Sequence, residues 1–332
     1  MNDFKELLDL PGPAQYQAYL KERLETLSVR ENYVLSAALM RRPPQDAEAA
    51  ADCLNSLEGY DVCPASSYEE LGRLSIQRLK VPEDVLPYVD LDQLGQRYAD
   101  EHPGLFIGKC YVAYPGQPEP PVRQENGAVS LWDGSWGVKL KLSSPAVPAG
   151  VWLRLPDYGV KELEIALYEL KVNSLDDCTL LDARCILPEV GNLMEQYNSA
   201  SELAWDGKNL GFIMDEQGQG EPHWLEKFAA ALEYEGCRTL KFALDISQNL
   251  QCYEWISNDG LADFATNHLR SCGVPEKLIQ SGAIDFNRYG ADILETSGYM
   301  ETGDERGYIT RNSRQFLYEH TTPDGMGMTM QQ

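Results

Sequence analysis

Carboxylates dominate the stretch from Gly211 to Trp255, and they are the residues of this chain whose type and spacing could support chemistry. Only three basic residues accompany them there, Lys227, Arg238 and Lys241. Carboxylates can act as a general acid and base, bind a metal ion, or present negative charge to a cationic partner. The acidic residues of this stretch are Asp215, Glu216, Glu221, Glu226, Glu233, Glu235, Asp245 and Glu254.

The middle of this stretch predicts an amphipathic helix that positions two of the carboxylates. Pro222 suits the first turn of the helix, and Gly236 suits its end. Glu226 and Glu233 are seven residues apart, so they lie on the same flank of the helix. The apolar face has the i, i+3, i+4, i+7 spacing and consists of Leu225, Phe228, Ala229 and Leu232.

Catalytic and metal-binding signatures around these carboxylates are weak. An enzyme built on Glu226 and Glu233 would need an apolar pocket and a carboxyl of raised pKa, and the sequence shows no sign of either. His223 and Glu226 have the spacing of metal ligands on a helix, but no second histidine or cysteine pair accompanies them. The Gly218-x-Gly220 turn lacks the length of a dinucleotide fingerprint and the lysine of a phosphate-binding loop, so we interpret it as a loop.

Two further acidic pairs have the residue type that binds Mg²⁺. They are Asp90-x-Asp92 and Asp176-Asp177. We interpret both as helix-start acids, because the helix dipole favours negative charge at a helix N-terminus. The sequence also has no Ser-His-Asp or Cys-His signature. It therefore predicts no metal, no cofactor and no enzymatic activity.

The composition is that of a folded protein with several domains. The chain has 332 residues, of which 43% are hydrophobic and 10% aromatic. It contains no run of 18 apolar residues, and its N-terminus lacks the basic and apolar regions of a signal peptide. Its eight cysteines are scattered, with no C-x-x-C pair. We therefore expect a cytoplasmic protein with reduced thiols and no membrane segment.

The net charge restricts the possible partners. The chain carries 52 acidic and 28 basic residues, which gives a formal charge of −24. The excess is largest in residues 151–332, which carry 30 acidic and 14 basic residues. We do not expect this chain to bind nucleic acid directly, because contacts to phosphates require a basic surface.

Two parts of the chain are similar at a constant offset of 193 residues. Leu35–Leu39 (LSAAL) aligns with Phe228–Leu232 (FAAAL), and after a two-residue insertion Gly95 aligns with Gly290. An offset that persists over about fifty residues indicates an internal duplication. Glycine inside a helix costs about 1 kcal/mol relative to alanine, so its presence in both copies indicates close helix packing.

The pattern of strands and helices predicts an α+β fold. Each copy is expected to end in one strand, Leu105–Tyr114 or Tyr308–Arg311. Between the copies, a proline-rich linker precedes a small module with strands at Val129–Trp132, Val138–Leu142, Val151–Leu155 and Thr179–Ile186 and a helix at Val160–Leu170.

We therefore expect an elongated, multi-domain chain of mainly helical modules with small antiparallel sheets and an internal duplication. The expected segments are 1–115 (N-terminal copy), 116–127 (linker), 128–200 (small α+β module), 201–255 (acidic helical module), 256–320 (C-terminal helical and strand module) and 321–332 (tail).

Five segments carry a resemblance to a known family. They are Trp152–Pro156 (WLRLP), Asp182–Pro188 (DARCILP), Tyr197–Leu203, Glu226–Ala230 and Ile284–Gly290. Together they resemble the ArdA-type antirestriction proteins, which occur on conjugative elements and phages. The resemblance covers roughly residues 137–320, and residues 1–115 then look like an additional copy of the family's middle and C-terminal parts.

This resemblance implies a DNA mimic that occupies the DNA-binding groove of type I restriction-modification enzymes. Duplex DNA carries one negative charge about every 1.7 Å of axis, and a helix rises about 1.5 Å per residue, so acids on several helices can form a comparable lattice. Members of the family are often dimers, so a homodimer is possible, although the duplication departs from that pattern. The expected phosphate-mimicking residues are Asp215, Glu216, Glu221, Glu226, Glu233, Glu235, Asp259 and Asp263.

One alternative to mimicry is an acidic helical adaptor that binds another basic protein. Such a partner includes a different defence nuclease, in the manner of an anti-CRISPR protein. Competition with DNA distinguishes these hypotheses, because only a mimic must occupy the site that DNA uses.

Overall fold

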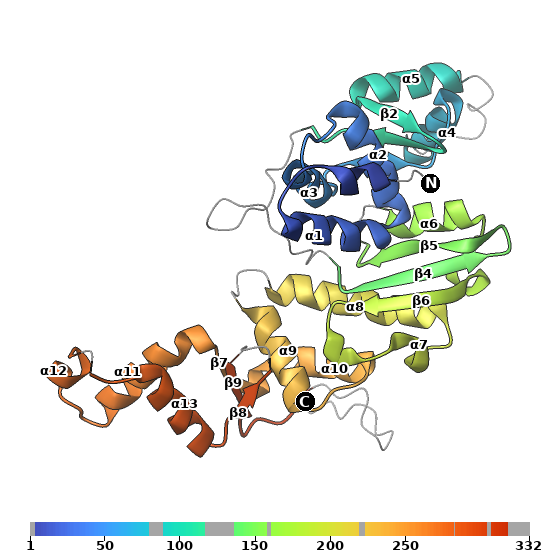
Figure 1. Cartoon of the computed structure of the whole chain (residues 1–332). Helices are drawn as coiled ribbons and strands as arrows, with labels where there is room; N and C mark the ends of the chain where they lie inside the picture. Colours follow the sequence, from blue (N-terminus) through green and yellow to red (C-terminus); the bar gives the residue numbers. More distant parts are fainter. Residues whose placement is uncertain are drawn as a thin grey trace. The chain divides into compact units, whose positions relative to one another are not determined.

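The computed structural model describes residues 4–79, 89–116, 136–157, 161–218, 223–281, 283–303 and 307–317. The chain divides into two compact units, which are Met1–Arg184 with Asn198–Ala204 (unit 1) and Cys185–Tyr197 with Trp205–Gln332 (unit 2). The described residues form thirteen α-helices and three three-stranded sheets (Figure 1). This confirms the expected α+β class. None of the helices in these ranges is long and apolar enough to cross a membrane.

Unit 1 opens with the 3₁₀ helix η1 (Lys5–Asp9) and α1 (Ala14–Glu25), followed by the first module. A capping box starts the module. The Ser28 hydroxyl accepts the Glu31 amide at 3.1 Å, and the Glu31 carboxylate accepts the Ser28 amide at 2.8 Å. The module consists of α2 (Val29–Arg41), α3 (Ala47–Asn55), β1 (Asp61–Cys63), α4 (Tyr68–Leu79), α5 (Leu91–Glu101), β2 (Gly104–Ile107) and β3 (Cys110–Ala113).

The sheet of the first module lies between helices. Its antiparallel strands have the order β1-β3-β2. Cys63 and Tyr111 pack with Leu71 of α4 on one face. Val62 and Val112 alternate with these residues, so they point to the opposite face, where α2 contacts all three strands.

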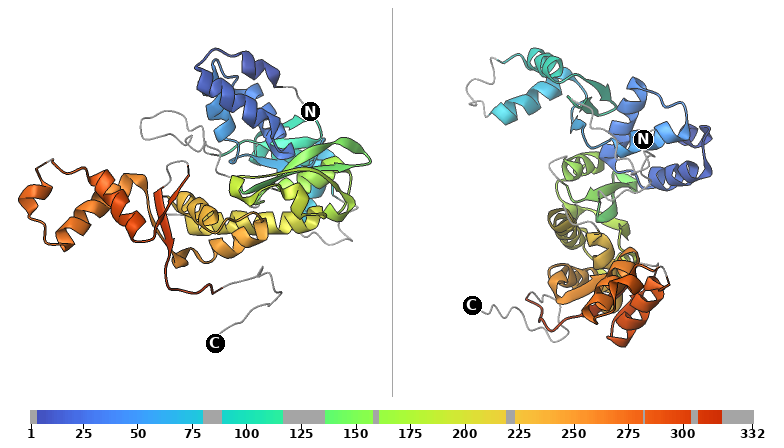
Figure 2. Two further views of the ribbon diagram at one scale, coloured as in Figure 1. Left: turned by 60° about the horizontal axis from the view of Figure 1, so that its bottom comes forward. Right: turned by 90° about the vertical axis from the view of Figure 1, so that its left-hand side faces the viewer.

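The second module belongs to unit 2 and has the same construction. Its strand order is β7-β9-β8, Leu261 of α11 and Leu294 of α13 pack with Tyr308 on one face, and α9 contacts all three strands. Figures 1 and 2 show α11 and α13 beside each other. The module consists of α9 (Trp224–Tyr234), α10 (Leu240–Ser247), β7 (Tyr253–Ile256), α11 (Leu261–Ser271), α12 (Glu276–Ile279), α13 (Phe286–Thr296), β8 (Met300–Thr302) and β9 (Gly307–Arg311).

The strand register of the two modules agrees residue by residue. Val62 lies opposite Val112 in the first module, and Trp255 lies opposite Ile309 in the second. The sequence alignment pairs Val62 with Trp255 at the offset of 193 and, after the insertions, Val112 with Ile309. The two modules therefore pair their strands at the positions that the alignment equates.

The helix starts agree in the same way. Asp90 accepts the amide of Gln93 at 3.0 Å at the start of α5, and Asp285 accepts the amide of Arg288 at 3.1 Å at the start of α13. An aspartate that accepts a backbone amide satisfies one of the free donors of the first turn. The aligned aspartates thus cap the corresponding helices, α5 and α13, in the two modules.

The expectation of one terminal strand in each copy is wrong. Leu105–Tyr114 forms the hairpin β2–β3, because Gly108 adopts a left-handed conformation (φ 57°) that turns the chain. The second module likewise ends in the hairpin β8–β9 rather than in Tyr308–Arg311 alone.

Two expected segment boundaries fall inside regular elements. The boundary after residue 200 lies within α8 (Ala200–Gly218), and the boundary after residue 255 lies within β7. Because β7 pairs with β9, residues 201–255 and 256–320 contribute to the same sheet.

The small α+β module between the two modules belongs largely to unit 1, and its described residues contain the expected strands near 138–142, 151–155 and 179–186 and the expected helix. Its sheet has the order β5-β4-β6, in which β4 and β5 are antiparallel. Leu140 lies opposite Leu153, and both are fully buried, as is Ile165 of α6. Lys139 and Arg154 form the neighbouring pair on the other face. The elements are β4 (Val138–Ser144), β5 (Val147–Leu155), α6 (Glu162–Leu170), the 3₁₀ helix η3 (Leu175–Asp177) and β6 (Thr179–Cys185).

Short elements precede or join the helices of unit 2. They are η4 (Pro188–Val190), α7 (Leu193–Gln196), η5 (Leu250–Cys252) and η6 (Asn258–Gly260). Some expected features lie outside the described residues, namely linker residues 117–127, the Val129–Trp132 strand, Gly220, Glu221, Pro222 and the tail 321–332.

Glycine permits close packing between the paired helices of each module, as the sequence predicts. A Cβ atom added to Gly95 would lie 1.9 Å from the carbonyl oxygen of Tyr68 on α4. A Cβ added to Gly290 would lie 3.0 Å from the carbonyl oxygen of Leu261 on α11. The helix backbones therefore approach more closely in the first module than in the second.

We expect Gly95→Ala to lower the free energy of unfolding by about 1–3 kcal/mol, because the methyl group would overlap a backbone carbonyl that cannot rotate away. The matched variant Gly290→Ala should change it by less than about 1 kcal/mol, because better helix propensity offsets the milder contact. Urea unfolding followed by circular dichroism measures both. Equal effects of the two substitutions would contradict the difference in helix spacing.

Candidate functional site

Asp215 and Glu216 lie near the C-terminal end of α8, and both are exposed. The last turn of this helix contains no basic residue. A helix C-terminus carries partial negative charge, so carboxylates there disfavour the helix by about 0.3–1 kcal/mol each. Local helix stability therefore does not account for these two side chains.

Glu226 lies in the first turn of α9, where the helix dipole favours negative charge. Its carboxylate contacts Nδ1 of His223, which precedes the helix with a left-handed backbone (φ 68°). Both side chains are about half exposed, at 52% and 48%. Glu226 thus remains available to a partner, while Glu221 lies outside the described residues.

Glu233 and Glu235 turn inward from the end of α9. The Glu233 carboxylate accepts the amide of Gly303 at 2.9 and 3.0 Å, and Glu235 accepts the hydroxyl of Tyr253 at 2.7 Å. Burial and this hydrogen bond raise the pKa of Tyr253. Arg311 lies 3.4 Å from Glu235. These two carboxylates attach α9 to the sheet of the second module.

Asp259 and Asp263 lie at the start of α11 and are both exposed. Asp259 belongs to η6, and Asp263 belongs to the first turn of α11. Both predicted residues are therefore exposed at the same end of α11.

The second module carries further exposed carboxylates that the sequence reasoning left out. Glu301 lies opposite Tyr308 in the β8–β9 pairing. Burial first, and then the negative charges of Glu301, Glu295 and Asp292, raise the pKa of Tyr308. These acids therefore surround one tyrosine on β9, the middle strand of the sheet. Their approach depends on the hairpin, which the sequence prediction missed.

Glu254 belongs to the same acidic surface. It is exposed on β7 and accepts the hydroxyl of Tyr299 at 2.8 Å. Burial and this bond raise the pKa of Tyr299 to about 12. The strand period places Glu254 on the same sheet face as Tyr308.

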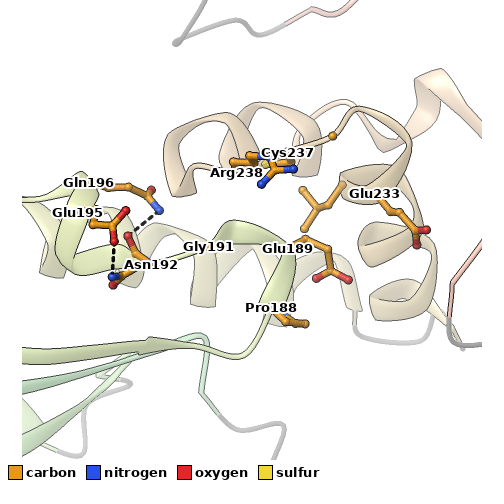
Figure 3. A pocket seen from close by; sticks show the side chains of 11 residues that line it. Pro188, Glu189, Gly191, Asn192, Glu195, Gln196, Glu233, Cys237 and Arg238 are labelled. Atoms are coloured by element: carbon orange, nitrogen blue, oxygen red, sulfur yellow. Dashed lines mark hydrogen bonds between the residues drawn. The ribbon is translucent and has the colours of Figure 1, made fainter.

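A shallow cavity of about 510 Å³ lies in unit 2, between the η4–α7 segment and the end of α9 (Figure 3). Asn192, Glu195 and Gln196 lie at one end, and Glu233 lies at the other. Burial raises the pKa of the Cys237 thiol in its wall to about 11, which makes the thiolate scarce at neutral pH. Glu226 does not line this cavity, so the structure does not assemble a Glu226–Glu233 pair there.

The two acidic pairs considered as Mg²⁺ ligands have partners within the protein. Asp90 caps α5, as expected, and Asp92 accepts the side-chain amide of Gln96 at 2.6 Å. Asp176 accepts the hydroxyl of Ser201. Within the described ranges, no group of three or more histidine, cysteine, aspartate or glutamate side chains could hold a metal ion.

A buried ionic cluster in unit 1 contains the most strongly perturbed carboxyls. Glu31 is fully buried and lies 2.5 Å from both Arg23 of α1 and Arg154 of β5. Burial opposes the charged form of Glu31, but the two guanidinium groups outweigh it and hold its pKa well below the usual range.

Glu162, at the start of α6, lies beside this cluster and is 2% exposed. One carboxylate oxygen accepts the Ser28 hydroxyl at 3.0 Å, while Oε2 is buried without a hydrogen-bond partner. Burial and the nearby Glu31 charge raise the pKa of Glu162 to about 7, against the effect of Arg154 and Arg30. A raised carboxyl pKa can mark an active site, but Glu162 does not line the cavity described above.

Comparison with known protein families, with characterised proteins and with solved structures finds no match to this chain.

The raised pKa of Glu162 makes stability depend on pH in a defined direction. A folded-state pKa above the unfolded value of 4.5 means that the folded chain binds this proton more tightly. The carboxyl therefore adds stability at low pH that is lost as pH rises to about 7. We expect the free energy of unfolding of Glu162→Gln to rise relative to that of the wild type between pH 4.5 and 8, by on the order of 3 kcal/mol at most.

Urea unfolding at several pH values measures this gain. Glu164→Gln, an exposed substitution on the same helix, is the matched control and should follow the wild type at every pH. A constant difference between Glu162→Gln and the wild type would show that Glu162 does not titrate in this range.

Proposed function

We propose that this chain is a DNA mimic that inhibits a DNA-binding enzyme by occupying its DNA-binding groove. The partner class that the ArdA resemblance implies is the type I restriction-modification enzymes. The observation that carries the proposal is the series of exposed carboxylates along α8, α9, α11 and the sheet of the second module, in a chain of net charge −24. Such restriction enzymes act in the cytoplasm, so the proposal locates the protein there.

We restrict the proposal to carboxylates that are exposed. Glu233 and Glu235 are only partly exposed and form hydrogen bonds within the second module, so the proposal no longer depends on them. The exposed set takes in residues from helices and from the sheet, and it consists of Asp215, Glu216, Glu226, Glu254, Asp259, Asp263, Asp292, Glu295 and Glu301.

We also infer that the two modules are copies of one ancestral module. The support is the shared order of elements, the equal strand register and the aligned capping aspartates. Four exposed acidic positions are shared as well, and the aligned pairs are Asp61 with Glu254, Glu70 with Asp263, Asp90 with Asp285, and Asp100 with Glu295. The first module therefore presents part of the same charge pattern.

Another basic protein, which includes a different defence nuclease, is the second candidate, because carboxylates attract any cationic surface. The distinguishing experiment mixes the protein with a purified type I restriction-modification enzyme and a fluorescent duplex that carries its recognition sequence. A mimic displaces the duplex at about one protein per DNA-binding site and without any added cofactor. Binding to the enzyme with the duplex still in place would instead support an adaptor.

Loss of several carboxylates should weaken inhibition additively. Exposed ion pairs contribute about 0.2–1 kcal/mol each, so a fourfold variant should lose about 1–4 kcal/mol of binding free energy. Its affinity should also depend less steeply on salt, because fewer charges are engaged. The variant changes Asp215, Glu216, Asp259 and Asp263 to their amides, and the measurement is the inhibition constant as a function of salt.

A second fourfold variant controls for net charge. It changes the exposed acids of the N-terminal helices, Glu6, Glu22, Glu25 and Glu48, to glutamine and therefore removes the same number of charges. This control should inhibit nearly as well as the wild type. An equal loss in both variants would mean that only total charge matters, and full loss from one single substitution would point to a localised site.

A further inference from the structure

Trp205 is the largest apolar side chain that the described residues leave exposed, with 67% of its surface accessible. It lies on α8 within unit 2. Exposing an indole ring forgoes a large gain from burial, and tryptophan is enriched among the residues that dominate binding energies at interfaces. The exposure of Trp205 therefore indicates a contact with another molecule.

The surroundings of Trp205 form a stripe along one side of α8. Asn209, Phe212 and Glu216 follow Trp205 at i+4, i+7 and i+11, so they lie on the same face of the helix. Phe212 is half-buried, and the Lys208 ammonium lies 5.4 Å from the centre of its ring. The stripe extends over about 16 Å at the helical rise per residue.

The charge around the stripe decides which occupant it fits. Asp215 and Glu216 lie beyond the aromatic residues at the negative end of the helix, where they raise the local negative charge. A second copy of this chain, with the same net charge of −24, would be repelled there. A cationic surface that also accepts a flat aromatic ring would be attracted.

We propose that Trp205 takes the place of a DNA base, stacking in the nucleic-acid site of the partner while Asp215 and Glu216 take the place of adjacent phosphates. This inference rests on the proposed function and adds to it an aromatic contact that charge alone does not provide. Nucleic-acid sites combine positive charge with stacking surfaces, and enzymes that modify a base accept it in an aromatic or apolar pocket. The stripe presents the complementary features, which are negative charge and an exposed aromatic ring.

The test compares Trp205→Ala and Trp205→Phe in the duplex-displacement assay with a type I restriction-modification enzyme. We expect Trp205→Ala to weaken displacement roughly 5- to 100-fold, which corresponds to the loss of one stacked ring. Trp205→Phe should retain most of the affinity, because phenylalanine still stacks. The slope of affinity against salt should stay that of the wild type in both variants, since no charge is removed.

Met40→Ala, at an exposed apolar residue of unit 1, is the matched control and should displace DNA as the wild type does.

If Trp205→Ala binds with wild-type affinity while the fourfold carboxylate variant binds more weakly, this inference is overturned and the proposed function stands. Equal losses for alanine and phenylalanine would overturn stacking. A wild-type dimer that Trp205→Ala converts to a monomer in sedimentation would assign the stripe to self-association. Failure of the wild type to displace DNA would overturn the proposed function itself.

Discussion

The buried carboxylate of Glu31 is the contact on which unit 1 depends most. It closes the capping box of α2, and it binds Arg23 of α1 and Arg154 of β5. Removing one partner of a buried ion pair costs about 3–5 kcal/mol, because a charge is left without compensation in the interior. The neighbouring carboxyl of Glu162 accepts the Ser28 hydroxyl, so the first module and the small α+β module are connected through two acids that repel each other. In this acidic chain, buried arginines therefore compensate the charge of a buried carboxylate.

The sequence predicted the fold well wherever a local signal determined it. The α+β class follows from the pattern of helices and strands, and the aligned glycines anticipated the close approach of the paired helices. It failed at the hairpins, because the positive φ of Gly108 turns a run of apolar residues that otherwise has the composition of one strand. The boundary at residue 255 failed for a different reason. The pairing of β7 with β9 joins residues more than fifty positions apart, and no local pattern records such a contact.

The candidate site could be predicted only in part, because exposure is a tertiary property. Glu226 and Glu233 have the same residue type on the same predicted helix, yet the first faces solvent and the second binds the amide of Gly303. Asp292, Glu295 and Glu301 were overlooked since they converge on Tyr308 only after the hairpin has formed. Trp205 carried no signal in the sequence, because an isolated tryptophan in a helix is more often part of a core. The arrangement of carboxylates and aromatic rings on the surface of unit 2 distinguishes between binding partners better than net charge alone does.

In each module, the last strand to be synthesised lies in the middle of the sheet, since β3 separates β1 from β2 and β9 separates β7 from β8. Before that strand emerges from the ribosome, the two outer strands have no neighbour to pair with, and exposed strand edges promote association between chains. Each sheet can therefore form only when its whole segment is available, in one cooperative step. The first module reaches that point at residue 113, more than a hundred residues before the second module begins, so the chain can fold one module while the other is still being translated.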